Sequence, residues 1–214
     1  MDGVIVDTAG YHYQSWVRLA QSFNYRFKKA DNEALKGVSR MQSLEIILAL
    51  ADEHRSTKEK EAMCATKNDW YLDLIGGMSS DEVLPGIRRF IQNLRRRKLK
   101  IALGSASKNA STILHQIGMT RLFDAIIDGN DIKKGKPHPE VFLKAAKALS
   151  TAPSKCLVFE DAGKGIEAAK AAGMCAVGVG DPRILNQADL VIPSFDGVTW
   201  RAMKSQMIRN GRCI

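Results

Sequence analysis

The stretch CLVFEDAGKG, residues 156–165, joins a short apolar run to two adjacent acids and then to the glycine-rich start of a helix. Short apolar runs between turn signals are typical of buried strands. Similar runs occur at residues 100–107, 125–128, 175–181 and 189–194. Helical patterns separate them, and this alternation predicts parallel strands joined by right-handed crossovers. The fold class that we predict is α/β, with a Rossmann-like parallel sheet at its core.

Two acids follow the first of these runs directly. Glu160 and Asp161 come after CLVF, and adjacent carboxylates at a strand end are costly unless a cation neutralises them. Oxygen ligands of this kind suit Mg²⁺, which keeps some of its waters and also binds substrate phosphate. The same residues could instead cap the helix that follows. We expect a magnesium site here, because ligands of such sheets bind beyond the carboxyl ends of the strands.

Two further residues could hold a phosphoryl group. Ser105 ends the run IALGS, where its hydroxyl and the adjacent backbone amides could bond a phosphate oxygen. Lys136 lies in GKPHPE, a loop before a proline-initiated helix, where an ammonium could balance the charge of a phosphoryl group in transfer. Taken alone, a turn serine and a surface lysine are the simpler interpretations.

The composition favours a soluble globular protein of the cytoplasm. The chain has 214 residues, of which 45% are hydrophobic and 26% charged, as in soluble globular proteins. It has no apolar run long enough for a membrane span and no secretory signal, so we expect a cytoplasmic protein with no membrane partner. Nothing in the sequence demands more than a monomer.

The formal net charge of +9 raises the question of nucleic acid. The densest basic run, Arg95–Lys98, closes a helix pattern, where cations interact favourably with the helix dipole. A solvated helix end and a nucleic-acid patch are both open interpretations of this run. Because no aromatic residues interleave with the charges to stack bases, we expect no nucleic-acid partner.

Residues 11–79 differ from the rest of the chain. Their patterns are helical, and the sequence STKE at residues 56–59 predicts a capping box before a long helix that ends at Gly76. We therefore expect a helical cap at residues 11–79, inserted into an α/β core made of residues 1–10 and 80–214.

Together with the opening residues, these pieces resemble the haloacid dehalogenase superfamily of phosphotransferases. That family has an Asp-x-Asp loop, a Ser or Thr at a strand end, a Lys and an acidic pair. The chain has DGVIVDT, GSAS, KGKPHP and FEDAGKG in this order. Over nearly its whole length the chain is also similar to the β-phosphoglucomutase branch of the superfamily. The cap segments TAGYHYQSW, LKGVSR and KNDWY carry much of this likeness.

The resemblance implies a role for each matching core residue. Asp2 would be the general acid/base that protonates the leaving oxygen and deprotonates the sugar hydroxyl. Ser105 and Lys136 would hold the transferring phosphoryl group. Glu160 and Asp161 would bind Mg²⁺, with the backbone carbonyl of Asp2 as a further ligand.

The resemblance also assigns residues to the sugar phosphate. Arg40 would pair with the phosphate that is not transferred, where a planar guanidinium is favoured over a point charge. Trp16 we instead predict to be core packing. Thr8 would act beside the catalytic groups. The resemblance also places a set of residues at the sugar site or at its closure hinge: Thr8, His12, Gly37, Ser43, Lys67, Ser107 and Asn109.

The chain departs from the family pattern at its start. The family's nucleophile is the first aspartate of Asp-x-Asp, and Met1 occupies the middle position here. The nucleophile and the first, central strand would therefore precede the given sequence. Without that strand its neighbours would lie about 9 to 10 Å apart, too far to hydrogen-bond. We expect that the start was misassigned or that the chain is truncated.

The predicted function follows from the resemblance. The complete enzyme would interconvert β-D-glucose 1-phosphate and glucose 6-phosphate through an aspartyl-phosphate and a bisphosphate intermediate, with Mg²⁺ as cofactor. One alternative is a sugar-phosphate phosphatase of the same fold, in which water accepts the phosphoryl group. Another is a catalytically inactive sugar-phosphate binder, because the nucleophilic aspartate is absent from the sequence.

Overall fold

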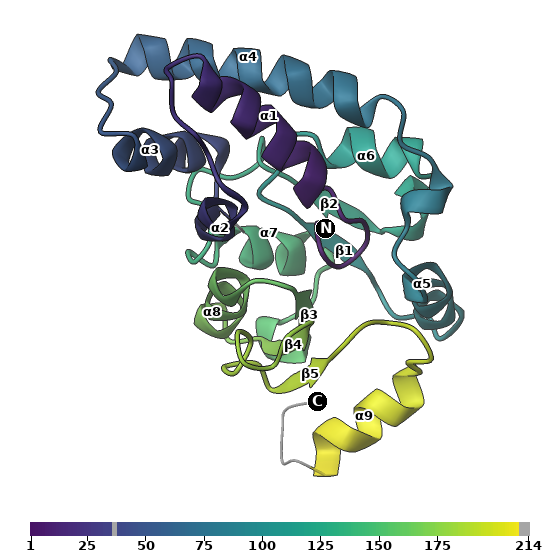
Figure 1. Ribbon diagram of the computed structural model, residues 1–214. Helices are drawn as coiled ribbons and strands as arrows, with labels where there is room; N and C mark the ends of the chain where they lie inside the picture. The colour runs from purple at the N-terminus through teal and green to yellow at the C-terminus, as the bar shows by residue number, and fades with distance from the viewer. Residues whose placement is uncertain (36–37, 210–214) are drawn as a thin grey trace. The chain divides into compact units, whose positions relative to one another are not determined.

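The computed structural model describes residues 1–35 and 38–209, and the chain forms two compact units (Figure 1). The first unit is made of Met1–Asp7 and Ser79–Ile214, and the second is Thr8–Met78. Each unit has its own hydrophobic core. In the described residues no helix is long and apolar enough to cross a membrane.

The second unit consists of helices in its described residues. Its elements are α1 (Ala9–Gln21), α2 (Lys29–Asn32), the 3₁₀ helix η1 (Glu33–Leu35), α3 (Arg40–Leu50) and α4 (Thr57–Ile75). The predicted capping box is confirmed, because Ser56 Oγ accepts from Glu59 N at 3.3 Å and Glu59 Oε2 accepts from Ser56 N at 2.7 Å. Helix α4 ends with Gly76 as its C-cap, as predicted.

The core of the helical unit lies where α4 packs against α1 and α3. Leu44 and Ile47 of α3 are fully buried there, and Phe27 joins them from the loop after α1. Trp16 is buried in the same cluster, which confirms its predicted packing role. This core fixes the faces of α1, α3 and α4 that carry the predicted cap residues.

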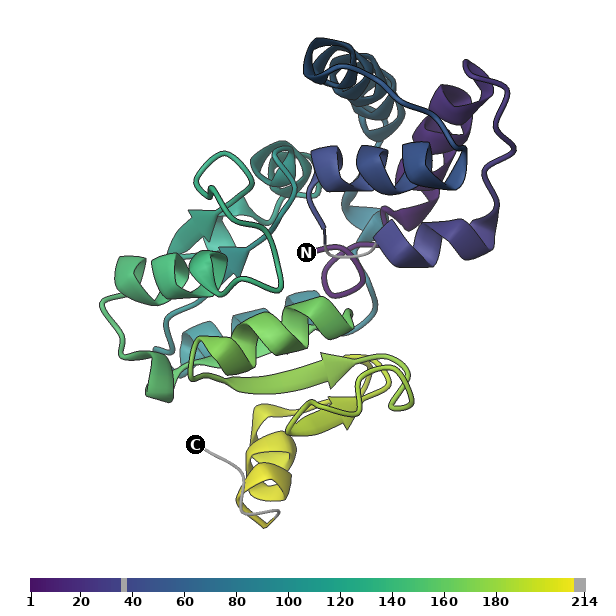
Figure 2. The same cartoon turned by 90° about the vertical axis from the view of Figure 1, so that its left-hand side faces the viewer.

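The first unit contains all the strands that the structure describes. They are β1 (Ala102–Gly104), β2 (Ala125–Ile127), β3 (Leu157–Glu160), β4 (Cys175–Val179) and β5 (Leu190–Ile192). Every one lies in an apolar run that the sequence predicted to be a strand. The pairings among these five strands are parallel, with Leu103 opposite Ile126 and Val158 opposite Ala176. Figure 2 shows β4 and β5 as neighbouring arrows that point the same way.

The strands form two parallel sheets, in the orders β1-β2 and β3-β4-β5. Among the described residues, β1 and β3 each have a ladder partner on one side only, whereas β4 is paired on both. Burial follows the pairing: all of β4 is buried, while Ala102 and Gly104 of β1 and Leu157 of β3 are partly exposed. The α/β class is confirmed, and the absence of a central strand stays a prediction.

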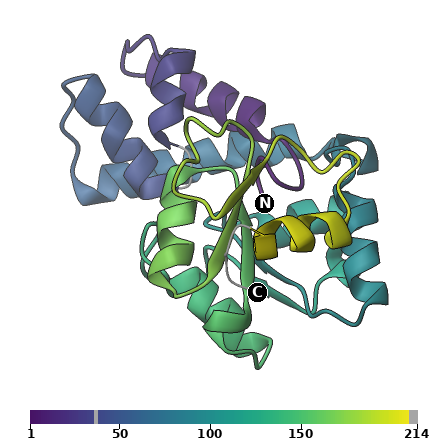
Figure 3. The same ribbon diagram turned by 90° about the horizontal axis from the view of Figure 1, so that it is seen from below.

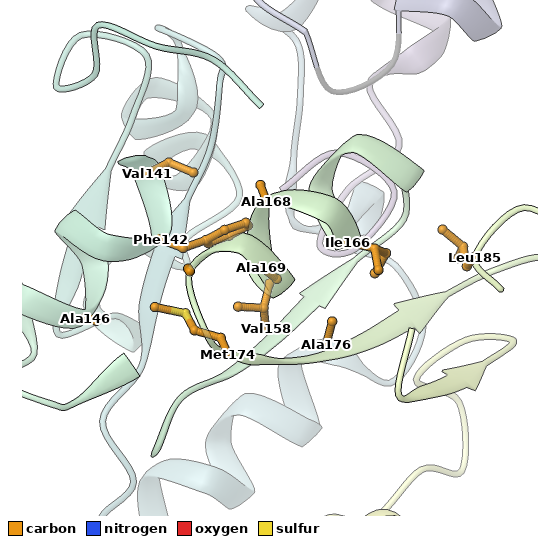
Figure 4. Packing of buried hydrophobic residues seen from close by; sticks show 11 residues of the cluster. Val141, Phe142, Ala146, Val158, Ile166, Ala168, Ala169, Met174, Ala176 and Leu185 are labelled. Atoms are coloured by element: carbon orange, nitrogen blue, oxygen red, sulfur yellow. The ribbon is translucent and has the colours of Figure 1, made fainter. Parts of the chain in front are cut away.

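Helices flank these sheets. The helical elements of this unit are η2 (Ser80–Glu82), α5 (Ile87–Arg96), α6 (Ala110–Gln116), η3 (Thr120–Leu122), α7 (Glu140–Ala148), η4 (Pro153–Lys155), α8 (Gly163–Ala171) and α9 (Trp200–Arg209). Figure 3 shows α8 and α9 on opposite sides of the sheet that contains β4. Figure 4 shows the core between α7, α8 and this sheet, where Phe142, Val158 and Ile166 meet.

Candidate active site

Predicted site residues end two strands of the first unit. Ser105 follows the last residue of β1, and Glu160 is the last residue of β3. The backbone N–H of Ser105 donates to the Ile127 carbonyl at 2.9 Å, which continues the β1-β2 ladder by one residue. Ser105 is 3% exposed and Glu160 5% exposed. Both side chains are therefore held by buried backbone at the carboxyl ends of strands.

Hydrogen bonds from side chains to the backbone link the residues of the loop after Ser105. Ser105 Oγ accepts from the backbone N–H of Ser107 at 3.1 Å, and Ser107 Oγ accepts from the backbone N–H of Asn109 at 3.2 Å. Helix α6 begins directly after Asn109, which is buried. The structure thus brings these three predicted residues into one turn.

Lys136 and Glu160 form a buried ion pair, although they lie 24 residues apart in the sequence. The ammonium of Lys136 also lies 4.9 Å from the centre of the Phe142 ring. Gly165, in the first turn of α8, lies directly against the carboxylate: a Cβ there would be 2.2 Å from Glu160 Cδ. The pair is therefore enclosed by α7, α8 and the end of β3.

Glu140 holds the loop that carries Lys136, and the sequence did not single it out. Glu140 Oε2 accepts from the backbone N–H of Lys133 at 3.2 Å and of Lys134 at 2.8 Å. Lys144 pairs with Glu140 Oε1 at 3.0 Å. The bond from Lys144, together with the backbone bonds, lowers the pKa of Glu140 to about 2. An acid directly after Pro139, at the first residue of α7, was the available signal.

The opening loop lies against Asp161. Gly3 has φ +65°, and a Cβ added to it would lie 2.1 Å from Asp161 Oδ2. The loop is closed by Gly3 N–H donating to the Val6 carbonyl and Ile5 N–H donating to the Met1 carbonyl, both at 2.8 Å. A glycine is required here, because the backbone is left-handed and the neighbouring carboxylate leaves no room for a side chain.

The charge of Asp161 is poorly compensated. Burial, together with the negative charges of Glu160 and Asp2, raises the pKa of Asp161 to about 6, although the N-terminal ammonium and Lys136 oppose the rise. Asp2, Lys136, Glu160 and Asp161 therefore lie close enough to act on one another. The sequence placed these residues in three separate motifs, and the fold brings them together.

The fit of a divalent cation depends on these carboxylates. In the part of the chain that the structure describes, no group of three or more His, Cys, Asp or Glu side chains has the arrangement of a metal site. Glu160 is instead bonded to Lys136. The donor chemistry nevertheless suits a hard cation, because the charges of Asp2 and Glu160 raise the pKa of Asp161, and a bound cation would relieve this repulsion. The magnesium site stays a prediction.

Helices α1 and α4 of the helical unit bring two predicted site residues, His12 and Lys67, together. The ring of His12 stacks on that of Tyr71 with 4.1 Å between centroids, and Lys67 Nζ lies 2.8 Å from His12 Nδ1. The Lys67 ammonium also lies 4.7 Å from the Trp16 ring and 4.6 Å from the Tyr71 ring. Lys67 is 1% exposed, so the cation is enclosed by an imidazole and two aromatic rings.

Arg40 is the first residue of α3. Its Nη2 donates to Asn68 Oδ1 of α4 at 2.6 Å, and burial lowers the pKa of Arg40. Thr8 and Ser43 are buried in the same unit. Gly37, which was also predicted to belong to the site, lies outside the described residues.

Comparison with known proteins identifies the class of this fold and site. The model of the haloacid dehalogenase-like hydrolases matches residues 1–173. The chain belongs to this family.

Individual relatives within the family are sugar-phosphate enzymes. The chain is 41% identical to the β-phosphoglucomutase of Bacillus subtilis, over 93% of this chain and 89% of that protein. It is 30% identical to a fructose-1-phosphate phosphatase of Escherichia coli, over 84% of this chain and 93% of that protein. The crystal structure of a β-phosphoglucomutase from Clostridium difficile superposes with a TM-score of 0.94 at 40% identity, covering 97% of this chain and 94% of the other.

Proposed function

We propose that this protein is a Mg²⁺-dependent phosphotransferase that interconverts β-D-glucose 1-phosphate and glucose 6-phosphate, acting as a monomer in the cytoplasm. The observation that carries the proposal is the gathering of Asp2, Lys136, Glu160 and Asp161 in one charged cluster. The identity to a β-phosphoglucomutase over nearly the whole chain supports this choice of substrate.

The proposed chemistry uses a nucleophilic aspartate that the 214 residues do not include. The phosphorylated form of that aspartate first gives its phosphoryl group to the free hydroxyl of glucose 1-phosphate: the bond from phosphorus to the aspartate breaks, the bond to the sugar oxygen forms, and Asp2 takes the hydroxyl proton. The resulting bisphosphate then turns over so that its original phosphate faces the aspartate. The aspartate attacks that phosphorus, the bond to the sugar oxygen breaks, and Asp2 returns the proton to this oxygen, which releases glucose 6-phosphate and restores the phosphorylated aspartate.

The remaining core residues neutralise and orient the phosphoryl group. Lys136 would balance its negative charge, and the buried Glu160 would hold the ammonium in place. The Ser105 hydroxyl would bond a phosphoryl oxygen. Asp161, Glu160 and the Asp2 carbonyl would hold Mg²⁺, which supplies further charge neutralisation when bound.

The helical unit would recognise the sugar phosphate. Arg40 would bind the phosphate that is not transferred, because its guanidinium can make two parallel bonds to phosphate oxygens. Lys67 and His12 would contact the sugar, with Ser43, Ser107 and Asn109 nearby in their own units. Thr8 and Gly37 would belong to the closure hinge.

A phosphatase of the same fold is the second candidate. The identity to a fructose-1-phosphate phosphatase favours it, since water would then accept the phosphoryl group in place of a sugar hydroxyl. The catalytic residues would be the same. The identity of the acceptor distinguishes the two functions.

One experiment separates these functions from a non-catalytic binder. Protein purified from its own source and the 214-residue chain are each given β-glucose 1-phosphate with Mg²⁺, and glucose 6-phosphate and free phosphate are measured. We expect glucose 6-phosphate without phosphate release from the first sample and neither product from the second. Phosphate release without glucose 6-phosphate would favour the phosphatase. If both samples are inert but bind glucose 6-phosphate in a calorimetric titration, the protein is a binder.

A further inference from the structure

The excess positive charge of the chain is confined to two segments. Residues 87–100 and 200–209 contain ten of the chain's 32 arginines and lysines and none of its 23 acids. The remaining 22 basic residues are therefore balanced by acids. The net charge of +9 is thus a local property of these two segments, which lie about 100 residues apart in the sequence.

The fold places the two segments side by side. Helices α5 and α9, which form most of them, contact each other in the first unit (Figure 1). The Phe90 ring of α5 lies 5.0 Å from the ring of Phe195, just before α9. We call the exposed basic residues of these helices and of the turn after α5 the α5/α9 basic surface. Its members are Arg89, Arg95, Arg96, Arg97, Lys98, Lys100, Arg201, Lys204 and Arg209.

The apolar faces of both helices are turned inward. Phe90 and Leu94 of α5 are buried, as are Met203 and Met207 of α9. Most of these cations therefore stand on helices whose opposite faces are buried. Like charges held this close together repel one another, and a bound polyanion would relieve that repulsion.

Few acids oppose this surface. Arg95 pairs with Asp124 at 3.1 Å, and Asp196 precedes α9. Arg88, beside the surface, donates to the backbone carbonyl of Ile117 at 2.6 Å, which leaves its charge in place. Arg97 likewise donates to the neutral side chain of Asn93 at 3.1 Å. The surface thus keeps most of its positive charge.

We propose that the α5/α9 basic surface binds the phosphate backbone of double-stranded nucleic acid without reading its sequence. Seven of the ten basic residues in the two segments are arginines, which match phosphate oxygens bidentately. A duplex backbone needs no stacking residues, so the lack of exposed aromatics does not weigh against it. The sequence alone favoured a solvated helix end because it could not show that α9 adjoins α5.

An anionic membrane is the competing partner, and the helix orientation disfavours it. Helices that lie in a membrane interface bury their apolar face among the lipids. In α5 and α9 that face already packs against the core of the protein. Leu99 and Ile208 are the exposed large apolar side chains of the two segments, so a contact with lipid would be mainly electrostatic.

The test uses the full chain, a fluorescent 20-base-pair duplex of mixed sequence and polarisation measured at several salt concentrations. If about five phosphates are contacted, the binding constant should fall about 500-fold between 50 and 200 mM salt. The surface variant changes four exposed residues to glutamine: Arg89, Arg96, Arg201 and Lys204. The control variant removes the same charge elsewhere by changing four exposed lysines to glutamine: Lys29, Lys58, Lys147 and Lys155.

We expect the surface variant to bind at least tenfold more weakly than the control at 50 mM salt, and its salt slope to be smaller by about 3 to 4. Circular dichroism and thermal unfolding check that both variants fold. Equal loss of binding in the two variants would refute the proposal, since net charge alone would then account for it. Failure of the wild type to bind duplex DNA or RNA at 50 mM salt would refute it too. If vesicles containing phosphatidylserine are bound instead, the partner is a membrane.

Discussion

The two units of the protein each bury a lysine, and they hold its charge in different ways. In the α/β unit, Lys136 is 5% exposed and forms an ion pair with the equally buried Glu160. In the helical unit, Lys67 is 1% exposed and lies against the imidazole of His12 and the rings of Trp16 and Tyr71. One cation pairs directly with a carboxylate, whereas the other makes contacts to an imidazole and two aromatic rings.

This difference determines what each cation depends on. Removing one member of a buried ion pair strands the charge of the other, which is costly. An imidazole and two aromatic rings can stay buried without a cation, because none of them needs a countercharge. We therefore expect the lysine of the α/β unit to matter for folding and the lysine of the helical unit to matter for binding.

The largest expected effect is that of Lys136→Met. It leaves the carboxylate of Glu160 buried without its partner, so the free energy of unfolding should fall by about 3–5 kcal/mol. Urea unfolding at pH 7 measures it. The double variant Lys136→Met/Glu160→Gln, which has no stranded charge, should recover most of this loss. If Lys136→Met were as stable as the wild type, the ion pair between Lys136 and Glu160 would not hold the loop that carries Lys136.

Gly3→Ala tests the contact between the opening loop and Asp161. Its new methyl group would meet the Asp161 carboxylate at a left-handed backbone position. Gly118→Ala is the matched control, because Gly118 has the same φ of +65° but nothing within 4 Å of its added Cβ. The control should lose about 1 kcal/mol, and Gly3→Ala at least about 1 kcal/mol more. Equal losses in urea unfolding would contradict the close packing.

The pH dependence of stability tests the charge of Asp161. Its pKa is raised to about 6, so its stabilising contribution is present at low pH and is lost as the pH rises through 6. Without metal, the free energy of unfolding should be about 1 kcal/mol lower at pH 7.5 than at pH 5 because of this residue. Asp161→Asn should remove that difference. Mg²⁺ should stabilise the wild type more at pH 7.5 than at pH 5, and an equal effect at both would speak against the metal site.

The smallest expected effect on folding is that of Lys67→Met. The lost cation–π contacts, worth about 0.5–2 kcal/mol, are offset because no charge has to be desolvated. We expect a net change within about 1 kcal/mol in urea unfolding. Calorimetry should show at least tenfold weaker binding of glucose 6-phosphate. Lys58→Met, on the exposed surface of the same helix, is the control and should change neither quantity. If Lys67→Met lowered the free energy of unfolding as much as Lys136→Met, both lysines would be needed for folding, and the proposed difference between them would be wrong.

Much of the fold could be predicted because strand and helix signals are local. The five strands lie in apolar runs that are readable without a structure, and Ser56 and Glu59 form the expected capping box. The polar residues at the ends of β1 and β3 could be located for the same reason, because they directly follow the apolar runs. The division into two sheets was not, because ladder partners are chosen among distant segments.

The relations between distant residues belong to the tertiary structure. Nothing near Lys136 in the sequence shows that its ammonium meets Glu160. Gly3 and Asp161 pack against each other although they lie 158 residues apart in the sequence. Such contacts depend on how whole elements pack, so no local pattern encodes them.

Residue type and short-range periodicity were thus sufficient for the class of the fold and for the strands that the structure describes. Packing decided which charges meet: a buried ion pair in one unit, an aromatic enclosure in the other, and α5 beside α9 on the surface. The physical reason is range. Hydrophobic periodicity acts over a few residues, whereas electrostatic pairing depends on distances that only the folded chain sets.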